Sequence, residues 1–184
     1  MELLARVYDH VTHKYQKGFT MLTLGWSDGY SFVPVGFNML SSSKQANRYQ
    51  EISDKIDHRT NGYKARKESL LSKPEAAILL IQRALRAGIQ ADYVLMDTWF
   101  TTEPMLAQIL ACGIDAVGMV KQLKQRYSYR GKNYTLPELR KFVRFASGKS
   151  IFGSVIVTTK TGIPVKIVIV RNRNKKSECL YLLS

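Results

Sequence analysis

The sequence predicts an α/β protein in which a core of strands and helices is followed by a region of antiparallel strands. Residues 75–120 read as helix, strand, helix and strand, and the last three of these make a β-α-β crossover unit. Residues 150–184 consist of apolar, β-branched runs separated by polar turns, which is typical of antiparallel strands. With 184 residues, 45% of them hydrophobic, the chain is long enough to bury a core.

The N-terminal part contains a hairpin. Residues 2–16 fit both a short amphipathic helix and an extended segment, so their structure stays open. Residues 18–26 and 30–40 are β-rich runs that flank a tight Asp-Gly turn at residues 28–29, which predicts a hairpin. Both runs are apolar at consecutive positions, which predicts strands covered on both faces and places the hairpin in the central sheet.

The next segments predict a loop region and a helix. Residues 41–73 form a polar, basic excursion with three consecutive serines and an Asn-Gly pair. Residues 75–88 predict a helix, because Pro74 and a glutamate stand at its start and Gly88 follows its end. Two arginines in the last turn of this segment favour the same end point, because they complement the helix dipole.

A strand, a helix and a second strand follow. The apolar strand at residues 93–96 runs directly into Asp97, and a helix over residues 101–113 is closed by Gly113. The strand at residues 114–120 should then be parallel to the first, joined to it by a right-handed crossover.

The character of the chain changes at residue 121. Residues 136–143 predict a short helix, and polar turns at 160–162 and 172–176 separate the strands of the last part. We therefore expect an antiparallel β subdomain over residues 121–184 with basic side chains at its hairpin tips.

Composition narrows the class of function. Lys and Arg number 28 against 14 Asp and Glu, so the net charge is +14 and a polyanion is the expected partner. Cys112 and Cys179 stand far apart without zinc-ligand spacing, which predicts neither a zinc site nor a disulfide framework. The N-terminus lacks an apolar signal region and no apolar stretch is long enough for a membrane span, so we expect a cytoplasmic protein without membrane contact.

Asp97 is the leading candidate for a chemical role. A carboxylate at the carboxyl end of a buried strand lies where open α/β sheets bind ligands, and it can hold a hard cation. The alternative is a cap at the start of the following helix, because Asp is a preferred capping residue. A single carboxylate cannot hold two metal ions, so position alone leaves both interpretations open.

Two stretches carry a family resemblance. Residues 9–42 (DHVTHKYQKGFTMLTLGWSDGYSFVPVGFNMLSS) and, after a polar segment, residues 93–106 (YVLMDTWFTTEPML) resemble the catalytic core of DDE transposases of bacterial insertion sequences. That resemblance implies an RNase H-like, integrase-like fold and Mg²⁺-dependent cleavage and transfer of DNA strands. It also implies that three acidic residues bind two Mg²⁺ ions, and Asp97 matches the second of these acids.

The resemblance further implies an internal fragment. No first core strand with its acid precedes Asp9, and the helix with the third acid would follow residue 184. The expected parts are a partial catalytic core, residues 1–120, and a truncated β-rich insertion, residues 121–184. Without its central strand such a chain should expose an apolar sheet edge and self-associate, and it should neither hold Mg²⁺ tightly nor cleave DNA alone. The parent could be a homodimer.

Basic residues are the candidates for DNA contact, with tyrosines interleaved that can stack on bases. The alternative for each is an ordinary solvated cation. The candidates are Lys14, Lys17, Lys121, Lys124, Arg126, Arg130, Lys132, Arg171, Arg173, Lys175 and Lys176.

Other polar residues have weaker chemical interpretations. His10 and His13 could form a metal pair on a helical face, but a surface or hydrogen-bonding role is favoured without a third ligand. Glu103 is expected to favour the N-terminus of its helix, and Asp115 to lie in a turn. Trp99 is expected in the core or in a pocket wall.

A second class of function stays open. The chain could be a noncatalytic basic α/β protein that binds nucleic acid and uses Asp97 only as a cap. A decayed remnant of a mobile element is a third interpretation, which composition does not separate from the first.

Overall fold

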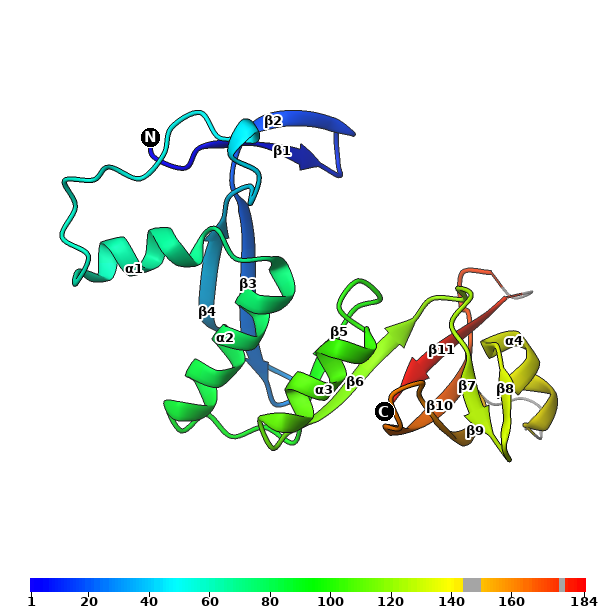
Figure 1. Ribbon diagram of the computed structural model, residues 1–184. Helices are drawn as coiled ribbons and strands as arrows, with labels where there is room; N and C mark the ends of the chain where they lie inside the picture. Colours follow the sequence, from blue (N-terminus) through cyan, green and yellow to red (C-terminus); the bar gives the residue numbers. More distant parts are fainter. Residues whose placement is uncertain (144–149, 176–177) are drawn as a thin grey trace. The chain divides into compact units, whose positions relative to one another are not determined.

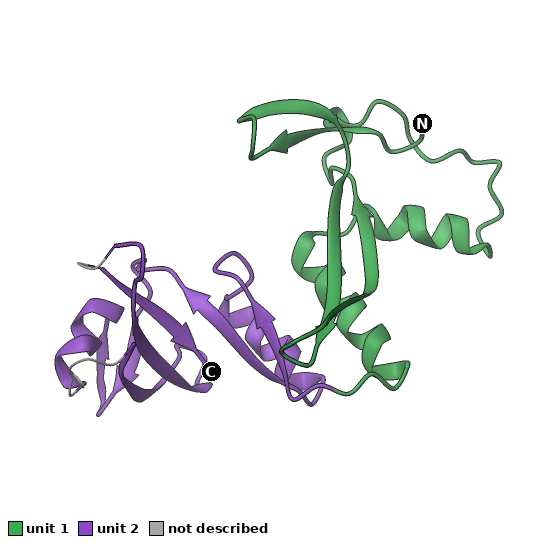
Figure 2. Cartoon of the chain, turned by 180° about the vertical axis from the view of Figure 1, so that it is seen from behind, with its two compact units in different colours: residues 1–90 green, residues 91–184 purple. Residues whose placement is uncertain are grey.

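The computed structural model describes residues 1–143, 150–175 and 178–184 (Figure 1). The chain divides into two compact units, Met1–Gln90 and Ala91–Ser184 (Figure 2). No helix among the described residues combines the length and the apolar character that crossing a bilayer demands.

The first unit is built from two hairpins and two helices. Its elements are β1 (Ala5–Asp9), β2 (Lys14–Gly18), β3 (Thr20–Ser27), β4 (Phe32–Leu40), a 3-10 turn (Gln45–Asn47), α1 (Asn61–Glu68) and α2 (Lys73–Arg86). β1 pairs with β2 and β3 pairs with β4, both antiparallel. Residues 2–16, for which the sequence allowed either a helix or an extended segment, therefore belong to a β-hairpin. Its first strand, β1, ends at Asp9 and pairs with β2.

The β3–β4 hairpin confirms the turn prediction. Asp28 accepts hydrogen bonds through Oδ1 from the N–H groups of Tyr30 (2.9 Å) and Ser31 (2.7 Å). Gly29 has a φ of +94°, a conformation that glycine adopts without strain. The local sequence thus specifies the chain reversal by itself.

The prediction that this hairpin belongs to a central sheet and is covered on both faces is wrong for the described residues. β3 and β4 form a two-stranded sheet of their own. One face packs against α2, where a Cβ added at Gly36 would lie 3.2 Å from Leu80. On the other face the side chains of Met21 and Phe37 are 63% and 66% exposed. The consecutive apolar residues of this hairpin therefore lie alternately on a face packed against α2 and on an exposed face.

Helix α2 matches its prediction, whereas α1 was not foreseen. Ser72 and Glu75 form a capping box at the start of α2, and Gly88 follows its end with a φ of +83°. α1 begins after Thr60, whose hydroxyl accepts from the N–H of Tyr63 at 3.2 Å. The sequence does not predict this helix, because Asn61 and Gly62 are its first residues and none of its side chains is buried.

The second unit contains one seven-stranded mixed sheet. Its elements are β5 (Tyr93–Met96), α3 (Glu103–Ala111), β6 (Asp115–Val120), β7 (Tyr127–Tyr129), β8 (Lys132–Tyr134), α4 (Leu136–Leu139), a 3-10 turn (Arg140–Phe142), β9 (Ile151–Thr158), β10 (Pro164–Arg171) and β11 (Cys179–Leu183). The strand order is β5-β6-β11-β10-β9-β7-β8, and β5 and β6 are parallel while the other pairs are antiparallel. The α/β class, the parallel crossover and the antiparallel C-terminal strands are confirmed.

Two details differ from expectation. Asp115 is the first residue of β6 rather than a turn residue. The predicted boundary at residue 120 falls inside the second unit, because β6 pairs with β11 from Gly118 to Val120. The predicted insertion region therefore shares one sheet with the crossover unit.

Candidate functional site

The junction between β5 and α3 carries Asp97. β5 pairs with β6 from Tyr93 opposite Asp115 to Met96 opposite Gly118, so Asp97 stands just beyond the carboxyl end of β5, while the parallel β6 continues to Val120. Its side chain is exposed. This is the position at which open α/β sheets bind ligands.

The carboxylate organises the turn that follows it. Asp97 Oδ1 accepts hydrogen bonds from the N–H groups of Trp99 (2.8 Å) and Phe100 (3.3 Å), and the main-chain oxygen of Asp97 accepts from the Thr101 hydroxyl at 2.6 Å. Asp97 therefore caps this turn and not α3, whose N-cap is Thr102. No hydrogen bond to the second carboxylate oxygen, Oδ2, is found among the described residues.

Close packing behind the turn holds its position. A Cβ at Gly118 would lie 2.2 Å from the hydroxyl oxygen of Thr101, which is buried, so only glycine lets the turn approach β6. Trp99 is 50% exposed and is not among the residues that line the pocket described below, which corrects the expectation that it lies in the core or in a pocket wall. The site is thus a rigid turn with one exposed carboxylate.

Glu103 connects this junction to the C-terminal strands. Glu103 Oε1 accepts hydrogen bonds from the N–H and the hydroxyl of Thr161, each at 2.6 Å. Partial burial raises the pKa of Glu103, but hydrogen bonds from Thr159 and Thr161 and the charge of Lys160 outweigh it, so the pKa is lowered. Glu103 is the first residue of α3, as expected. It also anchors the β9–β10 turn, a contact between residues 58 positions apart that the sequence did not predict.

Tyr127 is buried close to this anchor. Its side chain is 0% exposed, and its hydroxyl has no hydrogen-bond partner within residues 1–143, 150–175 and 178–184. Burial, together with the negative charge of Glu103, raises the pKa of Tyr127 to about 12. The hydroxyl therefore stays protonated at neutral pH.

A pocket of about 710 Å³ lies in the second unit beside the Asp97 turn. It is lined by Thr98, Thr101, Thr102, Glu103, Val120, Lys121, Leu123, Lys124, Gln125, Arg126, Ser128, Asn133, Thr159 and Lys160. Four of these side chains are cations, and Glu103 is the one acid among them. The pocket thus brings together Lys121, Lys124 and Arg126, which were predicted to contact DNA. It also includes Lys160, which the sequence placed in a turn and for which no role was predicted.

The remaining predicted cations of this unit lie elsewhere. Arg130 and Lys132 belong to the β7–β8 hairpin, and the Arg130 guanidinium lies 5.1 Å from the ring centre of Tyr129. Arg171 is the last residue of β10, and Pro164, near Lys160 in the chain, is the first. Seven residues of extended strand, about 23 Å, separate the two ends.

The turn between β10 and β11 holds two more predicted contacts. Arg173 is exposed, and Lys175 pairs with Glu178 at 3.2 Å. Lys176 lies outside the described residues. Among the described cations predicted to contact DNA, the pocket therefore includes Lys121, Lys124 and Arg126.

The described residues do not form a metal site by themselves. No three side chains of His, Cys, Asp or Glu come together in the described part of the chain. His10 and His13 lie in the β1–β2 turn rather than on a helix, and His13 Nδ1 is 3.3 Å from the Tyr8 hydroxyl. Asp97 offers one carboxylate, whereas sites for paired Mg²⁺ ions need several oxygen ligands.

Comparison with known proteins adds a family. A family model described as DDE superfamily endonuclease matches residues 2–130. No curated protein and no solved structure shows significant similarity to the chain. The matched region includes the β3–β4 hairpin, the Asp97 junction and three of the four cations that line the pocket.

Proposed function

Since the chain belongs to the DDE superfamily endonuclease family, we propose that it forms part of the catalytic domain of an insertion-sequence transposase, with Asp97 as one metal-binding carboxylate. The observation that carries this proposal is the exposed carboxylate at the carboxyl end of β5, beside the parallel strand β6. Bound Mg²⁺ would stabilise the charge that develops on the attacked phosphate. The described residues supply one of its ligands, so the remaining carboxylates must come from other segments.

The free edge of β5 supports this arrangement. Among the described residues β5 pairs with β6 alone, and its side chains Tyr93 and Leu95 are 50% and 69% exposed. An apolar strand with an unpaired edge invites a further strand. In the RNase H-like fold that the sequence resembles, the strand with the first acid would pair here.

The pocket supports DNA as the substrate. Lys121, Lys124, Arg126 and Lys160 present four positive charges beside the Asp97 turn. Lysine and arginine neutralise phosphates and thereby hold a nucleic-acid backbone in register. The pocket would place a DNA strand next to the carboxylate, and residues 121–184 would act as an insertion that completes this surface.

The first test is a transposition assay. The DNA that flanks the reading frame is translated in all frames, and the longest frame that includes this chain is expressed with a marked element. Asp97→Asn should reduce transposition below detection, because Asn keeps the cap through its Oδ1 but lacks the negative charge. Asp115→Asn is the matched control, since Asp115 lies at the opposite end of the same strand pair. Full activity of Asp97→Asn would refute the proposed role.

The second candidate function is noncatalytic binding of nucleic acid, which the turn-capping role of Asp97 favours. The isolated 184-residue chain should bind plasmid DNA without nicking it in Mg²⁺. Metal-dependent nicking that Asp97→Ala abolishes would show that this chain cleaves alone. If the extended reading frame encodes no further candidate carboxylates, and its protein binds DNA without cleaving it, the noncatalytic function is supported.

A further inference from the structure

The β1–β2 hairpin has one exposed face that carries two cations and two tyrosines. In the antiparallel register Arg6 stands opposite Lys17, and Tyr8 stands opposite Tyr15. All four side chains are exposed, whereas the intervening residues of β1 are less so. We call these four residues the ribbon face.

On the ribbon face a pair of cations lies next to a pair of aromatic rings. The Tyr8 and Tyr15 rings meet edge to face at 5.3 Å, and the Arg6 guanidinium lies 4.6 Å from the centre of the Tyr15 ring. Lys17 Nζ lies 4.7 Å from the ring of Tyr49, which belongs to the segment after β4. The cations are thus held in fixed places although they remain exposed.

Folding alone does not explain this pattern. Like charges directly opposite each other on paired strands destabilise a sheet, so Arg6 opposite Lys17 opposes hairpin formation. Asp9, the one acidic residue of the two strands, accepts from the Val11 N–H (2.9 Å) and the Thr12 hydroxyl (2.7 Å). Its carboxylate is therefore directed to the turn and does not neutralise the ribbon face.

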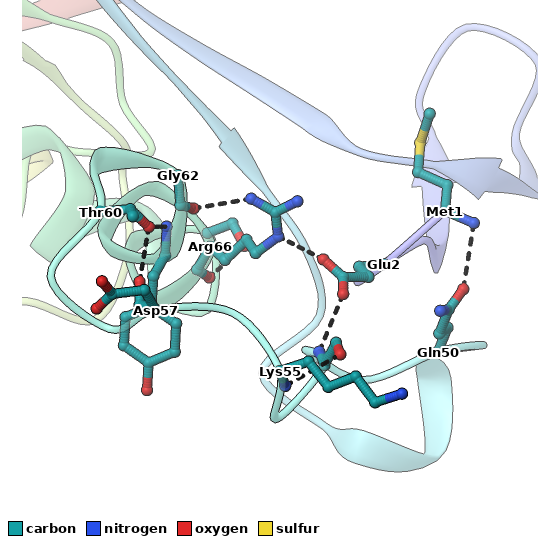
Figure 3. Close-up of polar contacts among 11 residues, drawn as sticks. Met1, Glu2, Gln50, Lys55, Asp57, Thr60, Gly62 and Arg66 are labelled. Carbon is teal, nitrogen blue, oxygen red and sulfur yellow. Dashed lines mark hydrogen bonds and ion pairs between the residues drawn. The ribbon is translucent and has the colours of Figure 1, made fainter.

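The base of the hairpin is anchored to the rest of the first unit. The N–H of Leu3 donates to the carbonyl of Gln50, and the N–H of Tyr49 donates to the carbonyl of Leu4, both at 2.8 Å. Glu2 pairs with Arg66 of α1, as Figure 3 shows. These contacts hold Tyr49 beside Lys17, and the turn end of the hairpin projects from the unit (Figure 1).

Met1 and Glu2 make further contacts at this anchor. The Glu2 carboxylate also accepts from the N–H of Ser53 at 2.9 Å, and the N-terminal amine donates to Gln50 Oε1 at 3.2 Å. The hydrogen bond from Arg66, followed by that from Ser53, lowers the pKa of Glu2. The anchor is therefore charged and intact at neutral pH.

We propose that the ribbon face is a DNA-binding surface distinct from the pocket of the second unit. A two-stranded ribbon has the width to enter the major groove of duplex DNA, where Arg6 and Lys17 reach phosphates and the tyrosines contact sugars and bases. An anion between the two opposed cations relieves the repulsion that the fold carries. The inference rests on the proposed function in one respect, namely that the chain acts on DNA.

The test measures binding of the full chain to a labelled duplex of about 30 base pairs by fluorescence anisotropy. Arg6→Gln/Lys17→Gln should weaken binding roughly 10- to 30-fold at about 0.15 M salt and reduce the salt slope by about 2. Lys44→Gln/Lys55→Gln is the matched control, since it removes two exposed cations from the same unit. Equal weakening by both double variants would overturn the proposal.

Two further measurements separate the possible failures. The melting temperature of Arg6→Gln/Lys17→Gln should equal or exceed that of the wild type, because like-charge repulsion is removed, so weaker binding will not reflect unfolding. If the wild type binds neither duplex nor single-stranded DNA, the proposed function fails together with this inference. If Lys121→Gln/Lys124→Gln weakens binding while the ribbon variant does not, the inference alone fails. Tighter binding to single-stranded than to duplex DNA would overturn the major-groove contact.

Discussion

Asp97 and Glu103 are two acids six residues apart with different roles. Asp97 caps a turn with one oxygen and exposes its side chain, which suits a ligand for a cation. Glu103 directs its carboxylate to Thr161, 58 residues further along the chain. The Asp97 carboxylate is exposed, whereas the Glu103 carboxylate fixes the β9–β10 turn at the wall of the pocket.

The lowered pKa of Glu103 predicts how stability depends on pH. Because the pKa is lower in the folded than in the unfolded chain, the anionic form stabilises the fold above the unfolded value near 4.5. This stabilisation is lost as the pH falls through the folded pKa. Glu103→Gln should therefore melt below the wild type at about pH 7, and the gap should narrow toward about pH 3.

Thermal melts followed by circular dichroism across this range provide the measurement. Glu178→Gln is the control, since Glu178 is an exposed glutamate of the same unit whose partner is Lys175. A gap for Glu103→Gln that stays constant or widens in acid would contradict the assigned role.

The helices α2 and α3 begin in different ways. Ser72 and Glu75 form a complete capping box for α2, whose buried residues include Ile78, Leu80 and Ile81. The N-cap of α3, Thr102, makes no side-chain cap hydrogen bond, although a proline follows in the first turn. The side-chain cap therefore contributes to α2 and not to α3.

Ser72→Ala should lower the free energy of unfolding by about 1 kcal/mol, because the N–H of Glu75 loses its partner. Thr102→Ala should cost clearly less, since no cap hydrogen bond is lost. Urea denaturation followed by circular dichroism measures both. An equal loss for the two variants would show that the capping box adds nothing.

At the scale of the whole molecule, exposed apolar surface accompanies the charge of +14. Met21, Phe37 and Met39 lie on the open face of the β3–β4 hairpin and are 63%, 66% and 41% exposed. Unpaired apolar strands favour contacts between copies, and net positive charge opposes them. Self-association should therefore increase with salt, which screens the charge.

Sedimentation velocity at about 0.05 and 0.5 M salt tests this balance. Phe37→Thr should reduce the associated fraction, because threonine suits a strand but buries far less apolar area. Tyr30→Thr serves as the control, since Tyr30 is fully exposed in the hairpin turn and outside this face. A monomeric wild type at both salt concentrations would refute the prediction.

Local chemistry explains the successful predictions. The Asp-Gly turn, the capped helix α2 and the strand before Asp97 depend on residues within a few positions of one another. The helix α1 was missed because Gly62 weakens its propensity and none of its side chains is buried. The membership of the β3–β4 hairpin in a larger sheet was wrong, since apolar runs do not specify a pairing partner.

The sequence by itself determined the β3–β4 hairpin, the helix α2, the β5-α3-β6 crossover and the family resemblance, because turns, caps and motifs are read from neighbouring residues. The tertiary structure alone decided that β6 pairs with β11, that Glu103 holds Thr161 and that Lys160 joins the pocket. It also placed Arg6 opposite Lys17 on one exposed face. These relations depend on strand register and sheet curvature, which arise when distant segments pack together and which no local pattern encodes.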